Sequence, residues 1–162
     1  MSTSLSDAAR TNLLRAIQIE ARNGRIYNSL AQLFQGYDVA ITGIFREMAA
    51  EELQHGAELE RHYFERFGPV PSPLGEAKEV IEAPDLDDAE ALIFDSMTIE
   101  QALQVGLRAE ETAREFYRCE MTRTSDPELQ AAYRELAEFE EAHVQLLKRK
   151  LEESRRAHNS SR

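Results

Sequence analysis

Apolar residues recur at every third or fourth position over four long stretches of the chain. This spacing places them on one side of an α-helix and is typical of helices that bury one face against their neighbours. The two breaks, at 35–38 and 124–127, are short, so we expect an antiparallel hairpin at each. The predicted helices cover residues 7–35, 39–67, 98–124 and 126–154.

Local signals at three of the predicted helix starts support these boundaries. Side chains that can cap a helix N-terminus stand there, and Pro127 suits the first turn of the last helix. After that helix, residues 155–162 are polar, and we expect them to form a disordered tail. The predicted caps are Ser6 or Asp7, then Thr98, then Ser125 or Asp126.

The segment between the two hairpins, residues 68–97, lacks a long apolar period. Its glycines and prolines end the second helix, and a short helix is expected at 87–94. The segment can travel the length of a helix, roughly 40 Å, so we predict a crossover that sets the third helix parallel to the second. The predicted fold is therefore all-α. Residues 1–154 form one domain, a four-helix bundle of two helical hairpins joined by a long crossover.

Charged residues interrupt the apolar face of each predicted helix. Residues 45–55 and 133–143 are two copies of one pattern, and each ends in Glu-x-x-His. Each of the other two helices places one glutamate on its apolar face and a tyrosine seven residues later. We predict that the four glutamates and two histidines meet at mid-height in the bundle. These residues are Glu52 with His55, Glu140 with His143, Glu20 with Tyr27, and Glu110 with Tyr117.

A carboxylate on an apolar face is costly unless a cation or a proton compensates it. The four clustered glutamates carry −4, which two divalent cations would balance. A Glu-x-x-His pair places both side chains on one face of a helix, so each pair can hold one ion. Two imidazoles favour iron or manganese over calcium or magnesium, and structural zinc sites usually include sulfur. The pattern therefore predicts a dinuclear metal centre.

Composition limits the partners and the compartment. The 162-residue chain has 30 acidic and 19 basic residues, a net charge of −11, which argues against nucleic acid and anionic membranes as partners. No apolar run approaches the roughly 20 residues that cross a bilayer, and the N-terminal residues have no apolar signal core. With Cys119 as its one cysteine, the sequence has neither an internal disulfide nor a Cys-x-x-Cys metal site. We therefore expect a cytoplasmic protein.

The six polar residues resemble those of the ferritin-like di-iron carboxylate proteins, whose bundles carry a glutamate on each of two helices and a Glu-x-x-His on each of the other two. Within that group the sequence is most similar to the rubrerythrins. The similarity covers nearly the whole bundle, residues 10–150. It is carried by Glu20-Ala21-Arg22-Asn23 leading to Tyr27, by Ile44-Phe45-Arg46-Glu47 leading to Glu52 and His55, and by Ala137 through His143.

The resemblance implies a non-haem di-iron oxidoreductase that reduces hydrogen peroxide, or reacts with dioxygen, in oxidative-stress defence. It implies two iron ions as the cofactor, with manganese as the alternative metal. It also implies that Tyr27 and Tyr117 are catalytic residues that hydrogen-bond the ligand carboxylates and tune them. The implied metal ligands are Glu20, Glu52, His55, Glu110, Glu140 and His143, with Glu52 and Glu140 as the bridging pair.

Two departures from the rubrerythrin pattern bear on function. Rubrerythrins usually carry a seventh carboxylate three residues after the third-helix ligand, and this chain has Ala113 at that place. The ligand shift associated with peroxide reduction in that family therefore has no carboxylate to use there. The sequence also lacks the rubredoxin-like domain with four cysteines, so we expect electrons from a separate protein such as a rubredoxin. We expect the protein to be a homodimer.

Two other functions fit the same residues. The ligand set also resembles the ferroxidase centres of bacterioferritins and ferritins, which oxidise ferrous iron and assemble into large storage cages. Leu53 stands where bacterioferritins have their haem-binding methionine, so no haem is expected. The other alternative is a metal-stabilised bundle that serves as an interaction module without turnover. Assembly size tests the first alternative, and peroxide consumption by the reduced protein tests the second.

Overall fold

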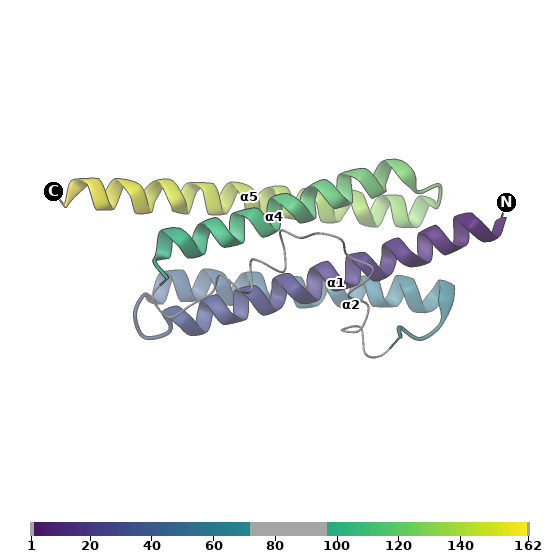
Figure 1. Cartoon of the computed structure of the whole chain (residues 1–162), viewed down its shortest axis with the longest axis horizontal. Coiled ribbons are helices and arrows are strands. Elements are labelled where there is room, and N and C mark those ends of the chain that lie inside the picture. The colour runs from purple at the N-terminus through teal and green to yellow at the C-terminus, as the bar shows by residue number, and fades with distance from the viewer. Residues whose placement is uncertain (1, 72–96, 162) are drawn as a thin grey trace.

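The computed structural model describes residues 2–71 and 97–161, which form four helices and no strand (Figure 1). The predicted all-α arrangement of two hairpins is confirmed, because α1 packs against α2 and α4 packs against α5. Figure 1 also shows that α4 runs parallel to α2, as predicted. The expected short helix at 87–94 lies outside the described residues. The helices are α1 (Ser2–Phe34), α2 (Val39–Phe67), α4 (Ile99–Arg123) and α5 (Pro127–Ser160).

The first hairpin turns where glycine and a capping aspartate adjoin. Gly36 has a φ of 82°, a left-handed conformation that glycine adopts without steric cost. Asp38 then caps α2, because its Oδ1 accepts a hydrogen bond from the Ile41 backbone N–H at 3.0 Å. At the other end of α2, Gly68 repeats the left-handed φ of 82° and its N–H bonds to the Phe64 carbonyl at 2.9 Å. Both ends agree with the predicted range.

The second hairpin is fixed by the caps of α4 and α5. Thr98 caps α4 as predicted, in a capping box in which its side chain and that of Gln101 each bond the other's backbone N–H. Asp126, rather than Ser125, caps α5: its Oδ1 accepts from two N–H groups of the first turn. Pro127 occupies the first helical position, as predicted.

Two predicted helix ends are wrong. The first helix begins at Ser2, so neither Ser6 nor Asp7 is its cap. The last helix continues to Ser160 and includes most of the segment 155–162 that was expected to be a disordered tail. An ion pair explains part of this extension, because Arg155 Nε donates to Glu100 Oε1 of α4 at 2.9 Å. The pair ties the exposed last turns of α5 to the neighbouring helix.

The core has two apolar parts with a polar layer between them. One cluster is formed by large side chains such as Tyr27, Phe45 and Leu103, and the other by side chains such as Leu13 and Tyr133. The buried glutamates and histidines belong to neither cluster. They are fully or almost fully buried, and they are Glu20, Glu52, His55, Glu110, Glu140 and His143.

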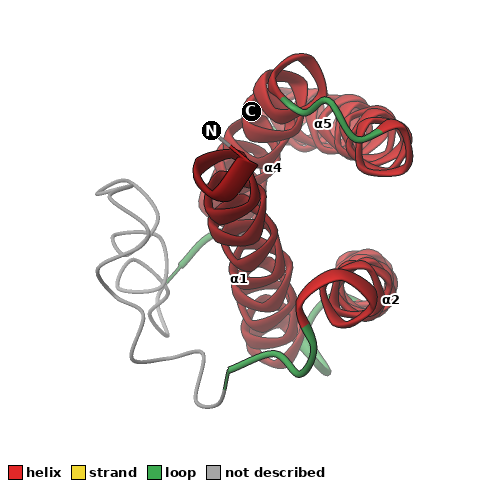
Figure 2. Ribbon diagram, turned by 90° about the vertical axis from the view of Figure 1, so that its right-hand side faces the viewer, coloured by secondary structure: helices red, strands yellow, loops and turns green. Residues whose placement is uncertain are grey.

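The two hairpins meet along α1 and α4. Figure 2, which looks along the bundle, shows α1 beside α4, with α2 and α5 facing each other on the same side of that pair. The two Glu-x-x-His segments lie on these facing helices. Side chains that cross the space between α2 and α5 therefore connect the hairpins on this side.

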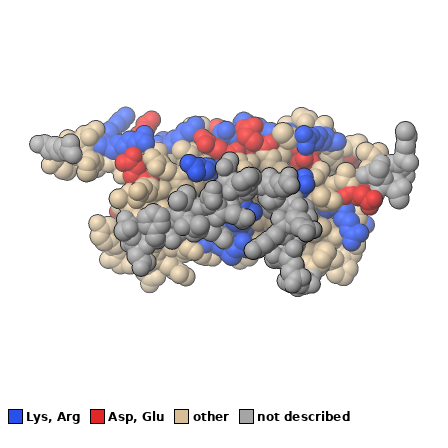
Figure 3. Space-filling view, viewed as in Figure 1, with Lys and Arg blue, Asp and Glu red and all other residues tan. Residues whose placement is uncertain are grey.

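Charge on the visible face is mixed. Figure 3 shows Lys and Arg alternating with Asp and Glu along the edge that α4 and α5 form. Ion pairs join these two helices, as where Arg114 and Arg118 of α4 both bond Glu141 of α5. The excess of acids does not gather into one patch on this face. Within the described residues, no helix is long and apolar enough to cross a bilayer.

Candidate metal centre

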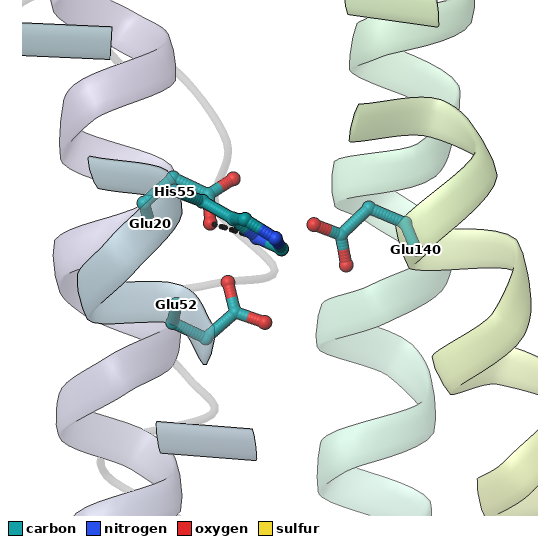
Figure 4. A group of neighbouring side chains, drawn as sticks. All are labelled: Glu20, Glu52, His55 and Glu140. Atoms are coloured by element: carbon teal, nitrogen blue, oxygen red, sulfur yellow. Dashed lines mark ion pairs between the residues drawn. The ribbon is translucent and has the colours of Figure 1, made fainter. Parts of the chain in front are cut away.

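The structure brings the six predicted ligands together in two overlapping groups. In each group the side chains offer ligand atoms that all lie within 4.8 Å of one another. Figure 4 shows the first group, in which Glu140 points from α5 across the interior toward three side chains of α1 and α2. Both groups contain Glu52 and Glu140. The first group is Glu20, Glu52, His55 and Glu140, and the second is Glu52, Glu110, Glu140 and His143.

These groups are buried, yet many of their polar atoms have no hydrogen-bond partner. All four glutamates are 0% exposed, and the two histidines are 5% and 6% exposed. Burying a polar atom without a partner costs about 1–3 kcal/mol, and a charged one costs more. A cluster of such atoms around one point indicates that a ligand belongs there. The unpartnered atoms are Glu20 Oε2, both oxygens of Glu52, His55 Nδ1, Glu110 Oε2, both oxygens of Glu140 and His143 Nδ1.

Two tyrosines divide the four glutamates into two kinds. The Tyr117 hydroxyl of α4 donates to Glu20 Oε1 of α1, and the Tyr27 hydroxyl of α1 donates to Glu110 Oε1 of α4. Each of these glutamates therefore has one oxygen held by a phenol and one left free. Glu52 and Glu140 keep both oxygens free. This difference matches the predicted roles: one free oxygen suits a terminal ligand, and two suit a bridge between metals.

Tyr27 fits its position because α4 has a glycine beside it. The Tyr27 hydroxyl also lies 3.2 Å from the Gly106 carbonyl oxygen. A Cβ at Gly106 would come within 3.1 Å of Tyr27 Cε1, which is tighter than normal packing allows. Burial, together with the charges of the neighbouring glutamates, raises the pKa of Tyr27 and of Tyr117 well above the usual phenol value. Both phenols therefore stay neutral and act as donors.

The cluster holds protons when no cation is present. Burial, followed by repulsion from neighbouring carboxylates, raises the pKa of Glu52 and of Glu140 well above the ordinary value. Burial opposes a charged His143, but the neighbouring carboxylates of Glu110 and Glu140 outweigh it and raise the pKa of His143 to about 11. Burial also opposes a charged Glu110, but its neighbours Glu140 and His143, together with the Tyr27 hydroxyl, outweigh it and lower the pKa of Glu110.

The donor set fits two divalent transition-metal ions. Two such ions balance four carboxylates and take the place of the protons. The free Nδ1 of His143 lies 3.5 Å from Glu110 Oε2 and 3.7 Å from Glu140 Oε2, and the free Nδ1 of His55 lies 3.5 Å from Glu20 Oε2. Each imidazole thus faces the carboxylates with which it would share a metal. Carboxylate with imidazole suits iron and manganese.

Two residues next to the histidines were missed by the sequence analysis. Glu51 of α2 lies beside His143 of α5, with 2.5 Å between Glu51 Oε2 and His143 Nε2. The Phe139 ring of α5 lies against the His55 ring of α2, with 4.8 Å between centroids. Glu51 and Phe139 occupy the same place in the two copies of the repeat, directly before Glu52 and Glu140. A comparison of the copies for differences, rather than for matches, would have found them.

A pocket of about 400 Å³ lies between α2 and α5 and reaches one histidine of the cluster. Its lining includes His55 and Phe139, three glutamates, and apolar and basic side chains such as Leu59 and Arg61. The pocket is large enough for several water molecules. It therefore connects the surface with the His55 side of the centre.

A third acidic group near this pocket already has a cation of its own. His62, Glu65 and Glu128 offer ligand atoms within the same 4.8 Å limit, but they are only partly buried or exposed. Arg66 bonds Glu128 Oε2 through Nη2 at 3.0 Å, and its Nη1 lies 3.3 Å from His62 Nδ1. Arg61 pairs with Glu65 at 2.8 Å, so both carboxylates of this group already have a cationic partner.

Comparisons with known proteins agree with this geometry. The model of the Rubrerythrin family matches residues 11–151. No curated protein matches the chain. Among solved structures, the chain is similar to an uncharacterised conserved protein from Magnetospirillum magnetotacticum MS-1, with 22% sequence identity and a TM-score of 0.66. That match covers 88% of this chain and 92% of the other. The predicted ferritin-like four-helix bundle is confirmed.

Proposed function

Because the chain belongs to the rubrerythrin family of ferritin-like di-iron proteins, we propose that it binds two iron ions and reduces hydrogen peroxide. One observation carries this proposal: the two ligand groups share Glu52 and Glu140, whose carboxylate oxygens are all buried and without partners. A shared pair of free carboxylates is what a dinuclear centre needs and a mononuclear centre does not.

Each iron ion would be held by one terminal glutamate, one histidine and the two shared glutamates. Glu20 and His55 would hold one ion, and Glu110 and His143 the other. Each phenol fixes one oxygen of a terminal glutamate and leaves the other directed inward. The protein thus orients the ligands before the metals arrive, which lowers the cost of binding them.

When bound, two ferrous ions supply the two electrons that, with two protons, convert hydrogen peroxide to two molecules of water. The chain contributes the surroundings for this reaction. The apolar clusters on either side of the polar layer exclude bulk water from it. The pocket whose lining includes His55 and Phe139 would supply a route for a molecule as small as peroxide or dioxygen.

Continued turnover needs a source of electrons that these residues do not contain. Cys119 is exposed and is the one cysteine of the sequence, so these residues hold no iron–sulfur cluster to supply them. We propose a separate electron-donor protein, such as a rubredoxin, and a homodimeric, cytoplasmic enzyme that acts in defence against oxidative stress. The ferroxidase alternative uses the same ligands and differs in preferring dioxygen and in delivering iron to a store.

The test is anaerobic reconstitution with ferrous iron, followed by a count of bound iron and addition of one equivalent of hydrogen peroxide per chain. We expect two irons per chain and oxidation of both by that one equivalent, faster than by an equal amount of dioxygen. An exposed pair on α2, Glu47→Gln with Glu60→Gln, is the matched control and should behave like the native chain.

Each other outcome selects a different function. Faster oxidation by dioxygen, with a particle much larger than a dimer in size-exclusion chromatography, would support the ferroxidase. Two bound metals with no reaction would support the non-catalytic bundle. Zero or one tightly bound metal would remove the dinuclear centre altogether.

A further inference from the structure

The two histidines of the centre are equivalent in the repeat but differ in what holds them. His143 of α5 has a carboxylate at its outer nitrogen, because Glu51 Oε2 lies 2.5 Å from His143 Nε2. His55 of α2 has a hydrocarbon ring at its side instead, with the Phe139 ring tilted 49° to it. The repeat therefore places a charged acceptor beside one imidazole and an apolar ring beside the other.

The carboxylate has two effects on His143. When a metal ion displaces the proton on Nδ1, a hydrogen bond from Nε2–H to this carboxylate keeps the remaining proton on Nε2 and leaves Nδ1 as the ligand atom. It also makes the imidazole more basic and holds the ring at one orientation. In that orientation Nδ1 faces Glu52, Glu110 and Glu140 at 3.5–3.7 Å. Phe139 has no acceptor oxygen with which to do the same for His55.

The two histidines are equally buried, at 5% and 6% exposed, but a surface pocket adjoins one of them and not the other. The pocket of about 400 Å³ between α2 and α5 includes His55 and Phe139 in its lining and does not include His143. A metal ion at His55 would therefore lie next to a route to the surface. A metal ion at His143 would lie behind the Glu51 hydrogen bond.

On the basis of the proposed dinuclear centre, we propose that its two metal positions are unequal, with Glu51 as the positioning residue that makes the His143 position the tighter one. The His55 position is the exchangeable one and takes up its metal second. Hydrogen-bond partners of ligating histidines typically change metal affinity by about 10–100-fold, so the two positions should differ by an amount of that order.

The test is a titration of the metal-free chain with manganese(II), followed by isothermal calorimetry, at one fixed pH. Manganese(II) is stable in air, and its anomalous X-ray scattering locates it. We expect two binding events whose Kd values differ by about 10–100-fold. Crystals grown with one equivalent of manganese(II) should show the anomalous peak at His143.

Substitutions of Glu51 and Phe139 test whether these two residues cause the difference between the two metal affinities. Glu51→Leu should weaken the tight event by about 10–100-fold and leave the weak event unchanged, and Glu51→Gln, which keeps an acceptor oxygen without the charge, should fall between. Phe139→Glu should strengthen the weak event. Glu47→Leu makes the same change of charge one turn away on α2, at an exposed position, and should leave both events as they are.

Equal Kd values in the native chain, with half-occupied anomalous peaks at both histidines, would overturn the inference and leave the dinuclear centre intact. Equal weakening of both events in Glu51→Leu would also overturn it, because a positioning role predicts an effect on one position. If Glu51→Leu does not fold, Phe139→Glu decides the question alone. Failure to bind any manganese would count against the proposed function instead.

Discussion

The polar middle of the bundle and its apolar ends differ in how their side chains are satisfied. In the two end clusters, buried side chains such as Leu13 and Leu103 fill space and need no partner. In the middle, four glutamates are fully buried and keep free oxygens that no side chain satisfies. The ends therefore stabilise the fold whether or not metal is present, whereas the middle becomes favourable only with cations. Selection for stability alone would not produce such a layer.

The largest expected effect comes from neutralising the two shared carboxylates, because this removes the charge that distinguishes the polar layer from the apolar ends. The double variant Glu52→Gln and Glu140→Gln keeps the shape of the layer and removes the charges that metal ions would balance. We expect bound metal to fall from two per chain to none. We also expect the metal-free variant to melt at a higher temperature than the metal-free native chain at neutral pH, because an amide is already neutral, whereas each buried carboxyl must first take up a proton. Metal analysis and thermal circular dichroism measure the two effects, and retained metal would show that other residues are the ligands.

Truncating a side chain in either apolar cluster should lower stability and leave metal binding unchanged. Leu103→Ala in one cluster, or Leu13→Ala in the other, removes a fully buried side chain. We expect each to lower the free energy of unfolding by about 2–5 kcal/mol. Metal per folded chain should remain two, because neither side chain belongs to the polar layer. Urea titration gives the first quantity. A truncated chain that folds fully but binds one metal would mean that the ends also shape the centre.

Tyr27 and Tyr117 lie at the boundary between the apolar clusters and the polar layer. Their rings belong to the clusters, and their hydroxyls donate to glutamates of the layer. Tyr27→Phe or Tyr117→Phe keeps the apolar ring and frees the second oxygen of a terminal glutamate. We expect metal affinity to fall by about 10–100-fold. Tyr133→Phe is the matched control, because its buried hydroxyl has no hydrogen-bond partner. Competition with a coloured chelator measures the affinities; equal losses in all three variants would contradict the assigned role.

The smallest effect is a dependence of stability on pH that has opposite signs with and without metal. A group whose folded pKa is raised contributes stability that is complete below its unfolded pKa and is lost as pH rises. The raised pKa values of Glu52, Glu140 and His143 therefore predict that the metal-free chain melts at a lower temperature at pH 8 than at pH 5. Glu110, with a lowered pKa, acts in the opposite sense, below its unfolded value of 4.5.

Metal-loaded protein should reverse this trend, because metal ions replace protons and bind more tightly as pH rises. Melting temperatures at the two pH values, with chelator and with excess manganese(II), provide the measurement. The double variant Glu52→Gln and Glu140→Gln should show a flatter profile in the presence of chelator. A native chain with the same slope in both conditions would contradict the exchange of protons for metal.

Periodic spacing predicted the helices well where capping side chains agreed with it. The predicted range 39–67 matches α2, because Asp38 and Gly68 mark its two ends. Periodicity failed beyond 154, since the last turns of α5 are held by the Arg155–Glu100 pair, which joins residues distant in sequence. Exposed polar turns have no apolar face that would reveal such a helix.

The candidate ligands could be predicted because charged residues stand at positions that the helical period places on the apolar faces, where burying a charge is costly. A glutamate among buried leucines demands compensation wherever the bundle places it, so spacing alone brought six side chains to one level. Glu51 had no comparable feature in the sequence that would mark it as part of the site. It is partly exposed and is one of many helix glutamates, and only the pairing of α2 with α5 sets it beside His143. Contacts between helices that are far apart in the chain depend on packing, which local patterns do not encode.

The two hairpins touch along α1 and α4, while α2 and α5 face each other through the ligand layer. Metal ions bound there would connect the two hairpins on the side of α2 and α5, whereas the packing between the hairpins lies along α1 and α4. In a cell short of iron, the metal-free protein would then open more readily between α2 and α5, and proteases would cut it faster. We expect its abundance to follow the iron supply through the lifetime of the chain, without any change in its synthesis.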